Sequence, residues 1–218
     1  RKIFSENYTK NHTIIMGINT EKEKNNFKKI YNSMVVLDNN LNLINEYNKI
    51  KLVPFGEFLP FESFFKSFGL KKVSFGYESF SSGKHRKIIN LNNKNFNFIP
   101  LICYEIIYSG NINLNKEETN FIINISEDGW FGNSVGPYQH FSHNIFRAIE
   151  EGKNIIRSAN NGISAFIDAN GIVVSKLETN NKGVIEIKKY KKFNETFFSK
   201  FGNKIFFYIF IFYFILII

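Results

Sequence analysis

Short apolar runs separated by turn residues recur along the chain and predict a series of β-strands. The expected strands are 13–19, 33–38, 43–46, 96–102 and 120–125, followed after a helix by the short segments NIIRSAN, ISAFID, IVVSKL and GVIEI. The first two are expected to be buried and the third is polar. Turn sequences separate these strands, from Asp38–Asn40 to the NNG, DANG and NNKG segments after residue 159.

One long helix is indicated from about Pro137 to Glu151. Proline suits the first turn of a helix, and Gly152 stands where a helix stop is expected. The expected apolar face consists of Phe141, Ile145, Ala148 and Ile149. Strands mixed with helices and ending in hairpins predict a mixed-sheet α/β domain built in layers.

The C-terminal run 205–218 contains 14 apolar residues and no charge. As a helix it would cover about 21 Å, against about 30 Å for the hydrocarbon core of a bilayer. A buried core helix is one interpretation. We expect instead the start of a transmembrane helix, because Lys204 and the pair Tyr208 and Tyr213 suit an interfacial anchor. The expected domains are therefore 1–200 and a membrane-entering segment 201–218.

The region 55–80 is rich in phenylalanine without a steady period. Its eight phenylalanines are Phe55, Phe58, Phe61, Phe64, Phe65, Phe68, Phe75 and Phe80. Regular alternation would favour a core, whereas this pattern also suits a mobile loop with an apolar tip.

Composition and charge narrow the possible functions. Hydrophobic residues make up 44% of the 218 residues, which argues against global disorder. The net charge of +9 is spread among many asparagines, and without a recognisable motif it does not favour nucleic-acid binding. The single cysteine excludes an internal disulfide and a multi-cysteine metal site.

The only cysteine, Cys103, stands at a strand end and is followed by Tyr104 and Glu105. By itself it fits either a small buried hydrophobe or a nucleophile. Lys49 and Lys51 precede the segment VPFGE, which contains Glu57. Solvated lysines and a turn carboxylate are the simplest interpretation of these charges.

A glycine-rich loop, 126–140, contains the only tryptophan, Trp130, and ends at His140. Such loops let the backbone approach a ligand closely. His140 and His143 have the i, i+3 spacing of a metal pair, but no third ligand is evident. A position on the helix surface or a hydrogen-bonded structural contact is the expected role.

Taken in order, these segments resemble one family. A lysine before VPFGE, then CYE, WFGxSxGPxQH and RxxNNG is similar to apolipoprotein N-acyltransferase, a membrane member of the nitrilase (carbon–nitrogen hydrolase) superfamily. The resemblance runs from about residue 13 to the C-terminal run. The segments YNKIKLVPFGEFLPFE and GPYQHFSHNIFRAIEEGKNIIRSANNGISAFID carry it most specifically. It implies an α-β-β-α nitrilase-like sandwich, incomplete at its N-terminus.

Nitrilase-type enzymes use a Glu-Lys-Cys triad, and the resemblance matches its cysteine to Cys103 and its lysine to Lys49 rather than Lys51. The supporting positions of the family match Glu57, Tyr104, Glu105 and Trp130. The triad glutamate is expected upstream of the strand 13–19, and Glu6 has the wrong context. The resemblance thus implies that this chain alone is inactive. Glu127, Gly129 and Tyr138 stand where Asn, Ala and Trp are expected.

The implied reaction moves an acyl chain from a phospholipid, through a cysteine thioester, to the N-terminal amine of a diacylglyceryl-cysteine lipoprotein. No cofactor or metal is implied, and a monomer is expected. The implied location is the bacterial inner (cytoplasmic) membrane, with the catalytic domain on the periplasmic side. The Phe-rich region would then be a lid that enters the lipid interface. Two alternatives are an amidase or nitrilase acting on a small amide or nitrile, and a catalytically incomplete lipid-binding relative.

Overall fold

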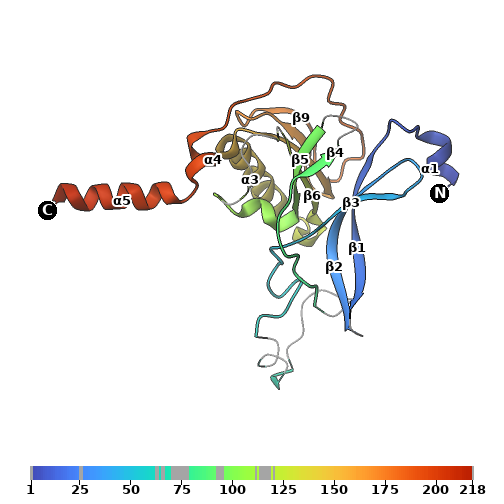
Figure 1. The fold of residues 1–218 in the computed structure, drawn as a ribbon, viewed down its shortest axis with the longest axis horizontal. Coiled ribbons are helices and arrows are strands. Elements are labelled where there is room, and N and C mark those ends of the chain that lie inside the picture. Colours follow the sequence, from blue (N-terminus) through green and yellow to red (C-terminus); the bar gives the residue numbers. More distant parts are fainter. Residues whose placement is uncertain are drawn as a thin grey trace. The chain divides into compact units, whose positions relative to one another are not determined.

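A computed structural model describes residues 2–24, 27–61, 64, 67–69, 79–91, 96–110, 112, 119 and 121–217. The chain forms two compact units, Arg1–Arg86 and Lys87–Ile218, each with its own β-sheet (Figure 1). The described residues of the first unit form helix α1 (Lys2–Asn7) and strands β1 (Ile14–Lys24), β2 (Phe27–Leu37) and β3 (Leu43–Asn48).

The sheet of the first unit is antiparallel, in the order β1-β2-β3. A turn centred on Asp38 joins β2 to β3, as predicted: the Asp38 carboxylate accepts hydrogen bonds from the backbone N–H groups of Asn40 and Asn42, both at 2.8 Å. The predicted burial of β2 is confirmed. The predicted burial of β1 is wrong, because Met16 and Ile18 are 40% and 47% exposed. Strand β1 pairs only with β2 in this sheet, so it is an edge strand with less cover.

The second unit contains a mixed sheet in the order β4-β5-β6-β7-β8-β9. Strands β5, β6 and β7 are parallel, and the other three pair antiparallel. The bounds are β4 (Ile89–Leu91), β5 (Phe96–Ile102), β6 (Phe121–Glu127), β7 (Asn154–Asn160), β8 (Ser164–Ile167) and β9 (Val173–Leu177). The predicted mixed-sheet α/β class is confirmed, and the finer four-layer arrangement stays a prediction.

Helix α3 (Gly136–Glu151) packs against one face of this sheet. It ends as predicted at Gly152, which has a left-handed backbone and donates its N–H to the carbonyl of Ala148. Phe141 and Ala148 of the expected apolar face lie in the core, with Ile145 packed against it. Ile149 is 47% exposed, so its place in that face is wrong. Buried polar residues share the buried side of α3: His140, Asn144, Arg147 and Glu151.

The predicted strand at 183–187 is also wrong. Between 178 and 196, a stretch the structure describes throughout, the chain forms no strand, and Val184 is 90% exposed. Side chains attach this segment to the sheet instead of a backbone ladder. The ring of Tyr190 packs edge-on against Phe121 at 4.6 Å, and the Asn154 side chain donates to the carbonyl of Lys191 at 2.9 Å.

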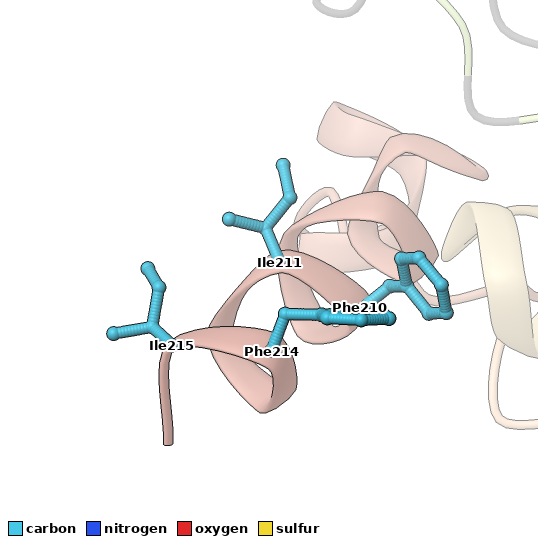
Figure 2. A pocket seen from close by; sticks show the side chains of 4 residues that line it. All are labelled: Phe210, Ile211, Phe214 and Ile215. Carbon is cyan, nitrogen blue, oxygen red and sulfur yellow. The ribbon is translucent and has the colours of Figure 1, made fainter. Parts of the chain in front are cut away.

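The chain ends in helix α4 (Phe197–Phe201) and helix α5 (Lys204–Ile217), so the helical conformation of the apolar run is confirmed. Figure 2 shows a shallow hollow on α5 that Phe210, Ile211, Phe214 and Ile215 line, all of them apolar side chains of this one helix. Across the residues that the structure describes, no helix reaches the length and apolar character needed to cross a membrane.

Candidate active site

Cys103 directly follows β5 and begins a short 3-10 helix, η2 (Cys103–Ile107). Its thiol is free and partly buried. The backbone φ angle of Cys103 is +49°, in the left-handed region that residues with a Cβ rarely adopt. Such strain persists only where surrounding contacts enforce it, and it is concentrated at functional sites. Cys103 thus occupies a constrained turn at a strand end, where the sequence placed a possible nucleophile.

The parallel strands bring polar residues from distant parts of the chain to the same edge as Cys103. In the register of β5 and β6, Ile102 lies opposite Ile125, so β6 continues two residues beyond the end of β5, to Glu127. Asp128 begins the 3-10 helix η3 (Asp128–Phe131) directly after β6, and Asn161 follows β7. The carboxyl ends of parallel strands are the usual place for ligand sites in α/β sheets.

Glu105 is completely buried two residues after the cysteine. Its Oε2 accepts a hydrogen bond from the backbone N–H of Ile102 at 2.9 Å. Tyr104 packs edge-on against Tyr108, with the ring centroids 5.4 Å apart. Burial, together with the hydrogen bond to Tyr104, raises the pKa of Tyr108 to about 12. Glu105 therefore braces the backbone before Cys103, while Tyr104 belongs to a small aromatic pair.

A buried polar network lies beside η2. His140 on α3 places its Nδ1 2.9 Å from Oδ1 of Asp128 and its Nε2 3.3 Å from the carbonyl oxygen of Cys103. Arg157 on β7 donates from Nη2 to Oδ2 of Asp128 at 2.6 Å. It also donates from Nη1 to Oδ1 of Asn124, whose own amide donates to the carbonyl of Leu101 at 3.3 Å.

The charges of the network stabilise one another. Burial alone would raise the pKa of Asp128, but the hydrogen bond from His140, the charge of Arg157 and the hydroxyl of Ser126 lower it to about 2. Burial lowers the pKa of Arg157, and the charges of Asp128 and Cys103 oppose that effect. Asp128 is therefore an anion near neutral pH, and it accepts a hydrogen bond from Arg157.

The sequence interpretation missed most of this network. For His140 the sequence left open a position on the helix surface or a hydrogen-bonded structural contact, and the structure shows the second. Asp128 and Asn124 were not singled out, and Arg157 entered only as the first residue of RxxNNG, although a charged residue in an apolar strand, as in NIIRSAN, was a usable signal. Gly162 also belongs here, because a Cβ at that position would collide with the Asp128 carboxylate.

The first unit brings two of the predicted site residues together. The side chain of Lys49 is completely buried, and its Nζ lies 2.8 Å and 2.9 Å from the two carboxylate oxygens of Glu57. Asn32 and the backbone N–H of Val53 donate to the same carboxylate at 2.7 Å and 2.8 Å. The simple interpretation of Lys49 as a solvated charge is therefore wrong, while Lys51 is exposed.

Trp130, the last residue singled out, lies in η3 and is 64% exposed. The neighbouring Glu127, one of the departures from the family pattern, accepts hydrogen bonds from the backbone of Gly129 at 2.8 Å and from Asn160 at 2.5 Å. An exposed indole beside a glycine-rich turn leaves an apolar surface open at this edge of the sheet.

The sheet of the second unit and its strand-end cysteine define an α/β protein of the nitrilase type. The chain matches the carbon–nitrogen hydrolase family over residues 2–188, and it belongs to that family. Its fold is similar to that of the NitN amidase from Neterenkonia sp. AN1, with a TM-score of 0.51 over 77% of this chain and 59% of the amidase, at 13% identity.

Among curated proteins, the chain is similar to apolipoprotein N-acyltransferases. It is 39% identical to that of Rickettsia prowazekii (strain Madrid E) over 188 residues, which cover 86% of this chain and 37% of the relative. It is 41% identical to that of Rhizobium leguminosarum bv. trifolii (strain WSM2304) over 158 residues, which cover 72% of this chain and 29% of the relative. The matched residues thus span only 37% and 29% of the length of these two relatives.

Proposed function

We propose that this chain carries the acyl-transfer centre of an apolipoprotein N-acyltransferase. The observation that carries the proposal is a free cysteine in a left-handed turn after β5, in a chain 39% and 41% identical to proteins of that name. The acyl donor is a phospholipid, and the acceptor is the N-terminal amine of a diacylglyceryl-cysteine lipoprotein.

The proposed reaction has two halves that both pass through Cys103. In the first, the thiolate attacks the ester carbonyl, a C–S bond forms, and the ester C–O bond breaks so that the lysophospholipid oxygen leaves and takes up a proton. In the second, the lipoprotein amine attacks the thioester, a C–N bond forms, the C–S bond breaks, and the amine proton passes to a general base. The thiolate is restored, so each turnover is balanced without a cofactor.

Lys49 has the charge that this chemistry needs. A free thiol has a pKa of about 8.5, so a nearby ammonium is required to keep a useful thiolate fraction. The same ammonium would stabilise the oxyanion of each tetrahedral intermediate. Its two contacts with Glu57 support a proposed role for that carboxylate, which is to hold the lysine in one position. Tyr104, Glu105 and Trp130 are proposed to complete the site.

The lipid substrates require a membrane location, which we propose to be the periplasmic side of the bacterial inner membrane. Two apolar surfaces suit lipid contact: the side chains of α5, and the exposed Phe55, Phe61, Phe64 and Phe68 of the Phe-rich region. Phe65 and Phe75, which the same expectation included, lie outside the described residues. Exposure of these four rings favours a surface role over a core, whereas Phe58 and Phe80 are half-buried.

The test uses the full-length protein and phospholipid vesicles. Incubation should give a mass increase equal to one acyl chain on the peptide that contains Cys103, and hydroxylamine should remove it. The Cys103→Ala variant should show neither the adduct nor transfer to a lipopeptide. An adduct that survives Cys103→Ala, or an active wild type that never forms one, would refute the proposal. Release of ammonia from a small amide without acyl transfer would favour the amidase alternative.

A further inference from the structure

Three consecutive residues at the end of β5 have backbone groups bound by buried side chains. Asn124 donates to the carbonyl of Leu101 at 3.3 Å, Glu105 accepts from the N–H of Ile102 at 2.9 Å, and His140 lies 3.3 Å from the carbonyl of Cys103. Each of these three side chains is at most 5% exposed. The left-handed turn is thus bound on both sides of the residue that adopts it.

Simple chemistry decides how His140 binds. A carbonyl oxygen can only accept a hydrogen bond, so Nε2 of His140 must be the donor to Cys103. The Asp128 carboxylate can likewise only accept, so Nδ1 donates to its Oδ1 at 2.9 Å only in a ring that carries a proton on both nitrogens, and Nη2 of Arg157 lies 3.3 Å from the same Nδ1. Asp128 therefore orients the His140 ring through Nδ1, and the opposite nitrogen, Nε2, faces the carbonyl of Cys103.

Arg157 connects the contacts made by His140 with those made by Asn124. One arm of its guanidinium binds Asp128, which orients His140, and the other binds Asn124, which holds Leu101. A third bond, from Nε to the carbonyl of Ile163 at 3.0 Å, fixes the guanidinium itself. Because Arg157 is 2% exposed, water does not compete for these bonds.

We infer that His140 is a positioning residue for Cys103, and that it acts by donating its Nε2–H to the Cys103 carbonyl while Asp128 and Arg157 hold the ring. A left-handed backbone is unfavourable for a residue with a Cβ, so Cys103 keeps its φ of +49° only while surrounding contacts hold it. Without the hydrogen bond, the turn relaxes towards ordinary φ values, and the thiol leaves the position in which it reacts. The inference rests on the proposed role of Cys103 as the nucleophile.

Two substitutions of His140 separate this hydrogen bond from general packing. Asparagine can place its amide near the former Nδ1 and contact Asp128, but it is too short to reach the Cys103 carbonyl. Glutamine is one methylene longer and can place an N–H donor near the former Nε2. Both are polar and smaller than or close to histidine in volume, so both should fold. His143→Gln, one turn along the same helix and half-buried, is the matched control.

The readout is the rate at which iodoacetamide alkylates Cys103 at pH 7 in the intact protein, followed on its own peptide by mass spectrometry. The His140→Asn variant should react about tenfold more slowly than the wild type. The His140→Gln variant should stay within about threefold of the wild type, and so should His143→Gln. Circular dichroism melting curves identify the folded variants.

Two results would overturn the inference: a folded His140→Asn variant that reacts at the wild-type rate, or a His140→Gln variant as slow as His140→Asn. Alkylation needs no acyl donor, so this test is independent of the proposed function. If the variants show the expected alkylation rates but the protein never forms a thioester, His140 is a positioning residue and the proposed acyltransferase function is refuted. If the protein transfers acyl chains normally but substitutions of residue 140 do not change the alkylation rate, the proposed function stands and the role of His140 is refuted.

Discussion

Arg157 and Asp128 form an ion pair in which both side chains are completely shielded from solvent, with Nη2 and Oδ2 2.6 Å apart. Removing one member of such a pair leaves the other charge buried without compensation, which typically costs about 3–5 kcal/mol. We therefore expect Asp128→Asn to lower the free energy of unfolding by about that amount. Urea denaturation at pH 7 measures it.

The control for this prediction is an exposed ion pair at the end of β9, in the same unit. Lys176 and Glu178 lie 2.5 Å apart with their side chains about half exposed. Exposed pairs contribute about 0–1 kcal/mol, so Glu178→Gln should change stability very little. If Asp128→Asn were as mild as Glu178→Gln, the buried pair would not be a structural element of this unit.

The same carboxylate predicts how stability depends on pH. Asp128 has a pKa of about 2 in the folded protein, below the ordinary value of 3.8. As the pH falls, the unfolded chain takes up this proton first, so the contribution is complete above about pH 5 and is lost progressively as the pH falls towards 2. A difference of this size corresponds to about 2 kcal/mol.

A comparison of the wild type with Asp128→Asn at several pH values isolates this contribution from the other carboxylates. The stability difference between them should be constant from pH 7 to about pH 5 and should shrink by about 2 kcal/mol as the pH approaches 2. A difference that does not change with pH would mean that Asp128 titrates normally in the folded protein.

The elements around this pair differ in how far the sequence predicts them. Helix α3 follows from local signals alone, because Pro137 suits its first turn and Gly152 takes the left-handed conformation that ends it. Strands β5 and β7 follow from their apolar runs. The position of Cys103 at a strand end could therefore be predicted without any knowledge of its neighbours.

The network could not be predicted in the same way, because its members meet only through the parallel pairing of β5, β6 and β7. Asp128 and Arg157 are 29 residues apart, and no local pattern specifies that they pair. The strand predicted at 183–187, which the structure does not form, failed for a related reason. The short apolar segment there predicts a strand, but a strand also needs a partner for its backbone, and local sequence does not report whether one is available.

The Phe-rich region offers a test of lipid contact. Phe64 and Phe68 are 58% and 69% exposed, and their ring centroids lie 5.0 Å apart. Changing both to serine removes apolar surface that is already in solvent, so the melting temperature should stay nearly unchanged. Acyl transfer from phospholipid vesicles should fall about tenfold, while transfer from a short-chain donor dissolved in detergent should not.

Phe98→Ser is the matched control for the serine pair, because Phe98 is completely buried in β5. Removing a buried phenylalanine ring typically costs about 3–5 kcal/mol, so this variant should be strongly destabilised. If the double variant at Phe64 and Phe68 were destabilised to a similar degree, the two rings would belong to a core and the lid interpretation would be wrong.

The pairing of Lys49 with Glu57 changes how the proposed catalytic role of this lysine must be tested. Lys49→Met removes the ammonium but leaves a carboxylate that is only 13% exposed, with its remaining donors from Asn32 and Val53. That uncompensated charge would destabilise the first unit. A lower acylation rate could then result either from unfolding or from the loss of the ammonium. The double variant Lys49→Met with Glu57→Gln avoids this, because a neutral amide replaces the carboxylate at nearly the same size.

We expect the folded double variant to form the Cys103 thioester about two to three orders of magnitude more slowly than the wild type, the usual loss for one oxyanion-stabilising group. Lys51→Met is the control for positive charge in this segment, because Lys51 lies two residues away and is exposed. Its acylation rate should stay close to that of the wild type, since water screens an exposed ammonium. Single-turnover acylation in the full-length protein, followed by mass spectrometry, distinguishes the two. Equal losses in both variants would indicate a general effect of charge, and a larger loss for Lys51→Met would assign the catalytic role to Lys51.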